Sequence, residues 1–276
     1  MLKLSIITVN YNNRKGLKKT ISSVLNQTFT NFEYIIIDGG SSDGSTVEIE
    51  LVAENLAYWA SEPDKGIFNA MNKGINKATG EYCLFMNSGD CFTNNEILNT
   101  VFSAPFSEDI VFADTICVNM RLTYPNKISL GYLISKSLPH QSTLIKKSLF
   151  EKVGLYNENN KIISDWEFSL KAIHLFNCTY KYLPGMVISR MELPGHSMNR
   201  RLTHLKYEET RRALITYFIP ILENKLQNNA SNDDLTDLAT KFFDTRDSKL
   251  VRLALKFEES KLFYFFRKVY YHISKS

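Results

Sequence analysis

Residues 32–45 read FEYIIIDGGSSDGS, an apolar run followed by an aspartate and a loop of glycine, serine and aspartate. An apolar run of this length without polar alternation is typical of a strand buried on both faces of a sheet. The glycines and serines indicate a turn, and helical character follows from about Thr46. The stretch therefore predicts a buried strand, a loop and a helix, which is the repeating unit of an α/β fold.

The same unit recurs on both sides of this stretch. Apolar runs predict strands at 4–9, 57–60 and 82–86, and helical spacing of apolar residues predicts helices at 15–26 and 67–78. Strands that alternate with helices predict a mostly parallel, Rossmann-like central sheet with helices on both faces.

Beyond residue 90 the pattern is less regular. Two possible capping boxes, Thr93-x-x-Glu96 and Ser164-x-x-Glu167, predict helix starts, and the second helix should run to about Phe176. The remaining expectations are strands at 109–113, 180–183 and 186–191, irregular strands and loops over 115–145, and helix from about Thr203 to the end with a polar break at 228–234.

Composition narrows the function classes. The chain has 276 residues, enough for one large α/β domain, and 44% of them are hydrophobic, which permits a substantial core. The net charge of +4 is too small to indicate a nucleic-acid partner. The four cysteines match no zinc spacing, and Cys83 and Cys178 lie in apolar runs. We therefore expect free thiols, a reducing compartment and no structural metal.

The N-terminus and the hydropathy of the chain suggest a location. The first apolar run is only about seven residues long and ends in the polar residues 10–13. A signal peptide needs a longer apolar region, and no stretch approaches the roughly 20 apolar residues of a transmembrane helix. We expect a soluble or peripheral protein in the cytoplasm.

Three of the predicted strands end in polar clusters. In parallel sheets, ligands bind beyond the carboxyl ends of the strands, so these clusters should converge on one site. The clusters are Thr8-Val9-Asn10, Asp38-Gly39-Gly40 and Asn87-Ser88-Gly89-Asp90.

These strand ends suit a nucleotide diphosphate and a divalent cation. Mg²⁺ and Mn²⁺ take oxygen ligands, often one or two carboxylates together with phosphate oxygens, and Asp90 is placed to be such a carboxylate. Asp38, which we expect to be exposed, could accept a hydrogen bond from a base N–H or a ribose hydroxyl. An aspartate after a strand is more often a turn former, and Asp43 is expected to be one.

Two other enzyme classes fit the sequence less well. A sugar-phosphate nucleotidyltransferase usually has a glycine-rich loop with arginine and lysine after the first strand, where this chain has residues 10–13, NYNN. A nicotinamide dehydrogenase requires G-x-G-x-x-G at the start of a helix, and residues 39–44, GGSSDG, do not match it.

An ordered set of motifs resembles the inverting family-2 glycosyltransferases, which have the GT-A fold. The resemblance covers roughly residues 2–200 and implies an enzyme that uses a nucleotide sugar. Its motifs are SIITVNYN (5–12), SVLNQT (23–28), IIDGGSSDGST (36–46), DKGI (64–67), AMNKG (70–74), ATGEY (78–82) and FMNSGD (85–90).

This resemblance also implies a domain organisation. A GT-A domain should occupy residues 1–200, with a nucleotide-binding half at about 1–92 and an acceptor half at about 93–200. Residues 201–276 should form a C-terminal helical extension.

The resemblance assigns donor-binding roles in the first half. Thr8 and Asn10 should line the base pocket, Asp38 should bind uracil or an equivalent base, and Asp64 and Lys65 should lie near the sugar diphosphate. Because Asp38 suits a uracil N–H, a UDP-sugar is the expected donor. The full donor-binding set is Thr8, Asn10, Asp38, Asp64, Lys65, Asn72, Asn87 and Ser88.

The sequence FMNSGD stands where the family has its Asp-x-Asp metal motif. Asp90 is the implied ligand of Mn²⁺ or Mg²⁺, whereas Asn87 and Gly89 replace acidic residues and lower the local negative charge. Asn87 raises the alternative of a catalytically inactive nucleotide-sugar-binding scaffold. Asp90 and the catalytic candidate Asp165 argue against that alternative.

The family's catalytic base is an acidic residue at the start of a helix in the second half. Asp165, in ISDWE (163–167), matches that place and would take the proton of the acceptor hydroxyl, with Glu167 as the fallback. His140 and Gln141, in LPHQST (138–143), should border the acceptor or phosphate side. His196, in PGHS (194–197), could help to hold the diphosphate or the metal.

The C-terminal segment 261–276 is rich in aromatic and basic residues and has no acidic residue. Such a composition favours binding at a membrane surface, although a packing helix or dimer contact fits it as well. Relatives that build surface polysaccharide, lipopolysaccharide or capsule often act on lipid-linked saccharides. We therefore expect a saccharide or lipid-linked saccharide acceptor, possible peripheral membrane contact at the inner face, and no nucleic acid.

Overall fold

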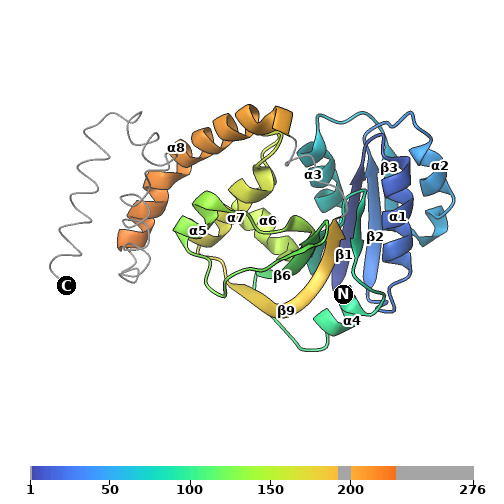
Figure 1. The fold of residues 1–276 in the computed structure, drawn as a ribbon, viewed down its shortest axis with the longest axis horizontal. Helices are drawn as coiled ribbons and strands as arrows, with labels where there is room; N and C mark the ends of the chain where they lie inside the picture. Colours follow the sequence, from blue (N-terminus) through green and yellow to red (C-terminus); the bar gives the residue numbers. More distant parts are fainter. Residues whose placement is uncertain (1, 192–199, 228–276) are drawn as a thin grey trace. The chain divides into compact units, whose positions relative to one another are not determined.

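The computed structural model describes residues 2–191 and 200–227 and has the α/β architecture that the sequence predicted (Figure 1). The chain divides into two compact units. The described parts of Met1–Asn126 and Leu138–Lys206 form the first unit, and those of Lys127–Ser137 and Tyr207–Ser276 form the second. The central sheet lies in the first unit. The division of the sequence into 1–200 and 201–276 stays a prediction.

Four parallel strands form the N-terminal half of the sheet, in the order β3-β2-β1-β4. They are β1 (Leu4–Asn10), β2 (Phe32–Asp38), β3 (Tyr58–Ser61) and β4 (Tyr82–Phe85). Every residue of β1 is buried, as its continuously apolar sequence predicted. The register pairs Asn10 with Asp38 and Asp38 with Ser61. The polar strand ends therefore meet at one edge of the sheet.

Helices cover both faces of this half, as Figure 1 shows. The connecting helices are α1 (Arg14–Leu25), α2 (Ser45–Glu50) and α3 (Ile67–Lys77), with a 3-10 turn η1 (Ala53–Asn55). The apolar side chains of α1 belong to one core cluster with Leu4, Ile6 and Ile36. On the other face, a Cβ at Gly74 of α3 would lie 2.5 Å from Ile7 Cγ2. A larger residue at 74 would push α3 away from β1.

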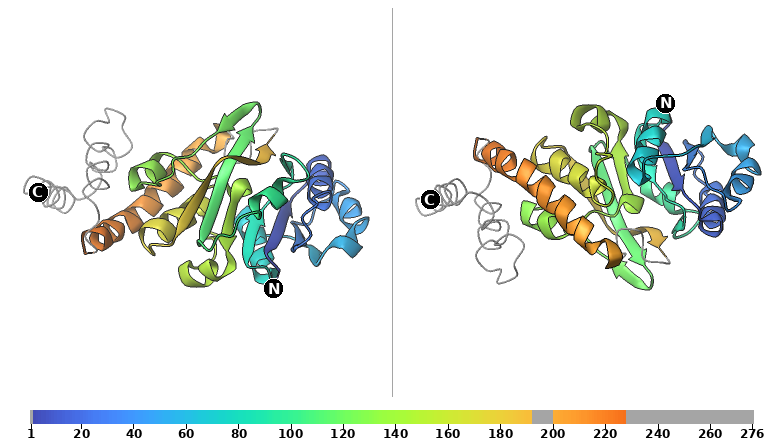
Figure 2. Two further views of the ribbon diagram at one scale, coloured as in Figure 1. Left: turned by 90° about the horizontal axis from the view of Figure 1, so that it is seen from below. Right: turned by 90° about the horizontal axis from the view of Figure 1, so that it is seen from above.

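The second half of the sheet reverses direction. β8 (Thr143–Lys146) pairs antiparallel with both β4 and β6 (Ile110–Cys117), and β6 pairs parallel with β9 (Tyr180–Met191). The short strands β5 (Asp90–Phe92) and β7 (Met120–Leu122) pair antiparallel with β9 and β6. The views in Figure 2 show β6 and β9 as the long strands of this half.

Further helices, most of them short, complete the described chain, and the last of them, α8, extends to residue 227. The elements are α4 (Ile97–Val101), α5 (Leu130–Ser135), η2 (His140–Ser142), α6 (Lys147–Val153), α7 (Ser164–His174), η4 (Arg200–Leu202) and α8 (Thr203–Gln227). No helix in the described part of the chain is long and apolar enough to cross a membrane. The polar break at 228–234 and the segment 261–276 lie outside the described residues.

Both predicted capping boxes are wrong, although helices begin at or near both positions. α4 begins at Ile97, and Thr93 Oγ1 donates to Val187 O (2.6 Å) instead of capping it. Ser164 is the first residue of α7, and its hydroxyl accepts a hydrogen bond from Asn157 N (2.6 Å). Tertiary partners have taken the side chains that the local pattern assigned to helix ends.

The strands predicted at 180–183 and 186–191 form one strand, β9, which continues through Pro184 and Gly185. The pairing with β6 shifts register beside Asp114, so the extra residues of β9 are accommodated as an irregularity. The four cysteines are buried free thiols, as predicted.

Candidate active site

A tight turn follows β4 and carries Asp90. The amide of Asp90 donates to Asn87 O (2.8 Å), and Gly89 has a φ of +104°. A type II turn requires a positive φ at its third residue, which favours glycine there. The turn directs the Asp90 side chain into a cavity of the first unit.

The reversal of strand direction brings His140 to this turn. Because β8 runs antiparallel to β4, the start of β8 lies beside the end of β4, with Leu84 opposite Leu144. η2 immediately precedes β8, so its first residue, His140, faces the residues that follow β4. His140 Nε2 lies 3.1 Å from Asn87 Nδ2 and 3.9 Å from Asp90 Oδ2.

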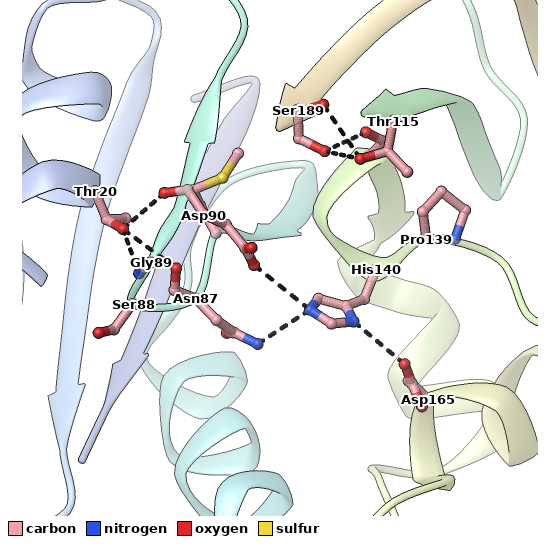
Figure 3. Close-up of polar contacts among 12 residues, drawn as sticks. Thr20, Asn87, Ser88, Gly89, Asp90, Thr115, Pro139, His140, Asp165 and Ser189 are labelled. Atoms are coloured by element: carbon pink, nitrogen blue, oxygen red, sulfur yellow. Dashed lines mark hydrogen bonds and ion pairs between the residues drawn. The ribbon is translucent and has the colours of Figure 1, made fainter. Parts of the chain in front are cut away.

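The other ring nitrogen of His140 contacts Asp165. Nδ1 lies 3.3 Å from Asp165 Oδ2 (Figure 3). A neutral imidazole with its proton on Nδ1 satisfies both neighbours, because Nδ1–H then donates to Asp165 and Nε2 accepts from Asn87. His140 thus links the turn after β4 to the first turn of α7.

Burial and charge set the protonation of this group. Burial raises the pKa of Asp90 to about 6, although Lys19, and His140 when it is protonated, oppose the rise. Burial lowers the pKa of His140. The hydrogen bond to Asp165 and the charges of Asp165 and Asp90 together raise it by more than burial lowers it, so the net shift is upward. Asp90 is therefore a desolvated carboxylate that a cation would stabilise.

The cavity has a volume of about 1030 Å³ and contains both carboxylates. Residues that follow β1 and β4 line one part of it, and residues from the start of α3 and α7 line another. The predicted site residues that line it are Asn10, Asp64, Asn87, Ser88, Asp90, His140 and Asp165.

Comparison with known proteins places the chain in a family. Residues 5–161, more than half of the chain, match the profile of Glycosyl transferase family 2. The chain belongs to this family. It is therefore a glycosyltransferase, an enzyme that uses a nucleotide-sugar donor, as the sequence motifs implied.

Two relatives support this assignment. A glycosyltransferase of Mycobacterium tuberculosis is 35% identical over 178 residues, which cover 61% of this chain and 68% of the relative. A PGL/p-HBAD biosynthesis glycosyltransferase of Mycobacterium bovis is 28% identical over 201 residues, covering 70% of this chain and 78% of the relative.

Solved structures establish the GT-A fold. Residues 1–349 of Staphylococcus aureus TarS, in complex with UDP-GlcNAc, superpose with a TM-score of 0.67 at 19% identity, covering 94% of this chain and 74% of TarS 1–349. The present chain covers 46% of a longer TarS chain. A mannosyltransferase from Pyrobaculum calidifontis, in complex with GDP-Man and Mn²⁺, has a TM-score of 0.60 at 14% identity, covering 99% of this chain and 83% of its own.

Asp38 differs from the sequence-based expectation in its exposure. Its carboxylate is completely buried and accepts hydrogen bonds from Asn10 Nδ2 (2.6 Å), from Ser41 N and Oγ (2.8 and 2.6 Å) and from Ser61 Oγ (2.6 Å). The expectation of an exposed carboxylate is wrong, because the loop after β2 folds back over it. Burial raises the pKa of Asp38, but these hydrogen bonds together lower it by more than burial raises it, so the net shift is downward.

Several other predicted residues join elements of the glycosyltransferase and do not line the cavity. Thr8 contacts Tyr34 Oη (2.9 Å) and donates to Met86 O (2.7 Å), which ties β1 to its neighbours. Asn72 donates to Tyr156 O and accepts from Tyr156 N (2.9 and 3.0 Å). The residues outside the cavity lining are Thr8, Asp38, Lys65, Asn72, Gln141 and Glu167.

Glu167, the fallback base, connects α7 to the loop that precedes it. Its side chain is buried and accepts hydrogen bonds from Asn160 Nδ2 and Asn157 Nδ2 in the preceding loop. This leaves Asp165, 22% exposed, as the acidic residue of α7 that lines the cavity. His196 lies outside the described residues.

The cavity-lining side chains that the sequence reasoning missed include Tyr11, Lys15, Lys19 and Lys161. Lys15 and Lys19 are four residues apart on the helix that follows β1, so helical spacing after the first polar strand end could have indicated them. The place of Lys161 depends on how the loop before α7 packs, and no local signal indicates it.

At the end of β2, Gly39 lies in close contact with side chains from two other segments. A Cβ at Gly39 would lie 2.5 Å from Asp64 Oδ2 and 3.2 Å from Tyr11 Cδ2. A larger residue at position 39 would force the Asp64 carboxylate to shift. The Tyr11 ring is 66% exposed at the cavity, so its face is open to a planar ligand.

The turn after β4 fits a hard cation in part. The described residues contain no cluster of three or more His, Cys, Asp or Glu side chains that could hold a metal ion. Asn87 Oδ1, however, is buried without a hydrogen-bond partner among the described residues, close to the desolvated carboxylate of Asp90. Amide and carboxylate oxygens suit Mg²⁺ or Mn²⁺ when substrate phosphates supply further ligands.

Proposed function

We propose that this glycosyltransferase transfers a sugar from UDP to a hydroxyl of a saccharide or lipid-linked saccharide, with inversion at the anomeric carbon. The supporting observation is that Asp90 and Asp165 line one cavity, on either side of His140. A single displacement needs stabilisation of the leaving diphosphate on one side of the sugar and a base on the other. The two carboxylates supply candidates for both tasks.

Asp165 is the proposed base. The acceptor oxygen forms a bond to the anomeric carbon and passes its proton to the Asp165 carboxylate. The bond from the anomeric carbon to the phosphate oxygen breaks, and the diphosphate leaves with the electron pair. His140 Nδ1–H holds one carboxylate oxygen of Asp165 in place, and Trp166 N donates to the other (2.9 Å).

The first half of the site is the proposed donor pocket. The exposed face of Tyr11 can stack on a base, and Lys15, Lys19 and Lys161 bring positive charge to the cavity that would take the diphosphate. Asp90 and Asn87 are the proposed holders of Mn²⁺ or Mg²⁺. The cation would neutralise charge on the leaving diphosphate.

Asp165→Asn is the decisive variant for this proposal. Release of UDP from UDP-sugars, measured with a panel of saccharide acceptors, should fall by about 10²- to 10⁴-fold, because general-base catalysis contributes on that order. Calorimetric binding of UDP should be unchanged. Glu167→Gln is the control for the other acidic residue of α7. Its activity should fall only in proportion to the fraction of protein that is no longer folded. Full activity of Asp165→Asn would refute the assignment.

Calorimetry also tests the donor and the metal. UDP, GDP and dTDP should each be titrated with Mn²⁺ and then with a chelator present. We expect UDP to bind most tightly, and to bind more weakly when the chelator is present. Preference for GDP or dTDP would overturn the UDP assignment, and equal affinity with the chelator would overturn the metal assignment.

The proposed pathway is the synthesis of surface polysaccharide, lipopolysaccharide or capsule at the inner face of the membrane. One relative is named a PGL/p-HBAD biosynthesis glycosyltransferase, which supports a biosynthetic role for this chain. The aromatic and basic segment 261–276 is the proposed peripheral membrane contact.

A further inference from the structure

One side of α1, together with Gln27 just after the helix, presents polar side chains to the segment that follows β4. Ser23 Oγ accepts from Phe92 N (2.7 Å), and Gln27 Nε2 donates to Asn94 O (2.8 Å). Thr20 precedes them on the same side, and its hydroxyl contacts the turn that carries Asp90. The helix and Gln27 thus contact the chain from residue 87 to residue 94 through hydrogen bonds.

The hydroxyl of Thr20 both accepts and donates a hydrogen bond. It accepts a hydrogen bond from Gly89 N (3.0 Å), and its single proton has its shortest acceptor in Asp90 O (2.7 Å). Gly16 O (3.1 Å) and Asn87 O (3.2 Å) are more distant alternatives. Thr20 is completely buried, so water cannot replace these bonds without a rearrangement.

These bonds hold the backbone on both sides of Asp90. The bond from Gly89 N holds the chain before Asp90, and the bond to Asp90 O holds it afterwards (Figure 3). The bond from Asp90 N to Asn87 O closes the turn between them. With the backbone held at these three places, the Cα–Cβ direction of Asp90 has little freedom.

We infer that Thr20 is a positioning residue for the metal-binding turn, and that its hydroxyl fixes the direction in which Asp90 presents its carboxylate to the diphosphate–metal site. This inference rests on the proposed function, which assigns Asp90 to the metal. It gives the side of α1 facing the turn a task in donor binding, in addition to packing.

Two variants separate the hydroxyl from the packing of Thr20. Thr20→Val keeps the shape but leaves Gly89 N–H and Asp90 C=O without their buried partner, so the turn must move to reach water. Thr20→Ser keeps the hydroxyl. Loss of a residue that orients a metal ligand typically weakens metal affinity about 10- to 100-fold. We expect UDP binding with Mn²⁺ to weaken by this factor in Thr20→Val and to be restored in Thr20→Ser.

Ser5→Ala is the matched control. Ser5 is also a completely buried hydroxyl, and it donates to Glu33 Oε1 (2.6 Å) and accepts from Gly80 N (2.9 Å) away from the cavity. It should lower stability without weakening UDP binding in Mn²⁺. If Ser5→Ala weakens binding as much as Thr20→Val does, general destabilisation explains the effect and the inference is overturned.

Hydrogen exchange of the peptide backbone over residues 87–92 gives a readout that does not depend on binding. Exchange there should speed up in Thr20→Val and stay as in the wild type in Thr20→Ser and Ser5→Ala. Unchanged exchange in Thr20→Val overturns the inference whatever the nucleotide results. Wild-type protein that binds no nucleotide would instead refute the proposed function, and with it the assignment of Thr20 to donor binding.

Discussion

The backbone at Gly89 has a φ of +104°, in the region that side chains with a Cβ avoid. A Cβ at this position would have no close neighbour, since its nearest atom is Asn13 Nδ2 at 3.5 Å. The conformation itself therefore requires the glycine. Gly154, after α6, has a φ of +95° and no atom within 4 Å of a Cβ, so it provides the same strain away from the site.

We predict that Gly89→Ala and Gly154→Ala each lower the free energy of unfolding by about 1–3 kcal/mol, the usual cost of a strained backbone conformation. Urea unfolding measures this change. Only Gly89→Ala should also weaken UDP binding in Mn²⁺, because only that turn carries Asp90. Equal effects of the two variants on UDP binding would contradict the role of the turn.

For single residues, the sequence predicted which carboxylates line the cavity better than it predicted how buried each carboxylate is. Asp90 was predicted from its place after a strand and Asp165 from the family resemblance; both line the cavity, and their chemical roles stay predictions. The burial of Asp38 could not be predicted, because it depends on Ser41 folding back and on Ser61 arriving from another strand. Which side chains surround a carboxylate is a property of tertiary packing, and one sequence does not state it.

At the scale of elements, Glu33 connects three parts of the sheet. Its carboxylate on β2 accepts from Ser5 Oγ of β1 (2.6 Å) and from Gly80 N (3.1 Å) and Thr79 Oγ1 (3.0 Å) just before β4. Partial burial raises the pKa of Glu33, but these hydrogen bonds together lower it by more than burial raises it, so the pKa lies below its ordinary value of 4.5.

A lowered pKa in the folded state fixes the sign of the pH effect. The stabilisation by Glu33 is complete above the ordinary value and is lost as the pH falls through the lowered pKa. We predict that Glu33→Gln lowers the free energy of unfolding at pH 7 by about 1–2 kcal/mol, and that the loss becomes smaller in acid. Urea unfolding from pH 7 to pH 3 measures it. A constant difference across this range would contradict the assignment.

Elements with a strong periodic signal were predicted well, and those defined by partners were not. The helix predicted at 67–78 corresponds to α3 (Ile67–Lys77), and the run 32–38 is β2. The direction of β8 was not predicted, because a short apolar strand carries no mark of its orientation. The capping boxes failed for a related reason, since Thr93 and Ser164 found partners distant in sequence.

For the whole molecule, membrane contact is the property to test. We predict that the full chain floats with liposomes containing anionic lipid and that a chain lacking residues 261–276 does not, because basic and aromatic side chains bind such surfaces. High salt should reduce flotation of the full chain. Unchanged flotation after the deletion, or none with the full chain, would end the membrane proposal.

The antiparallel pairing of β8 with β4 also bears on how such an enzyme can diversify. It places His140 beside Asn87 although 53 positions separate them in the chain. The active-site contact depends on the register of two short strands and not on the length of the chain between them. Loops inserted between β5 and η2 should therefore preserve this contact, provided that β6, which pairs with β8, stays in place. Such loops would change the surface near the proposed acceptor side while the proposed donor pocket stays as it is.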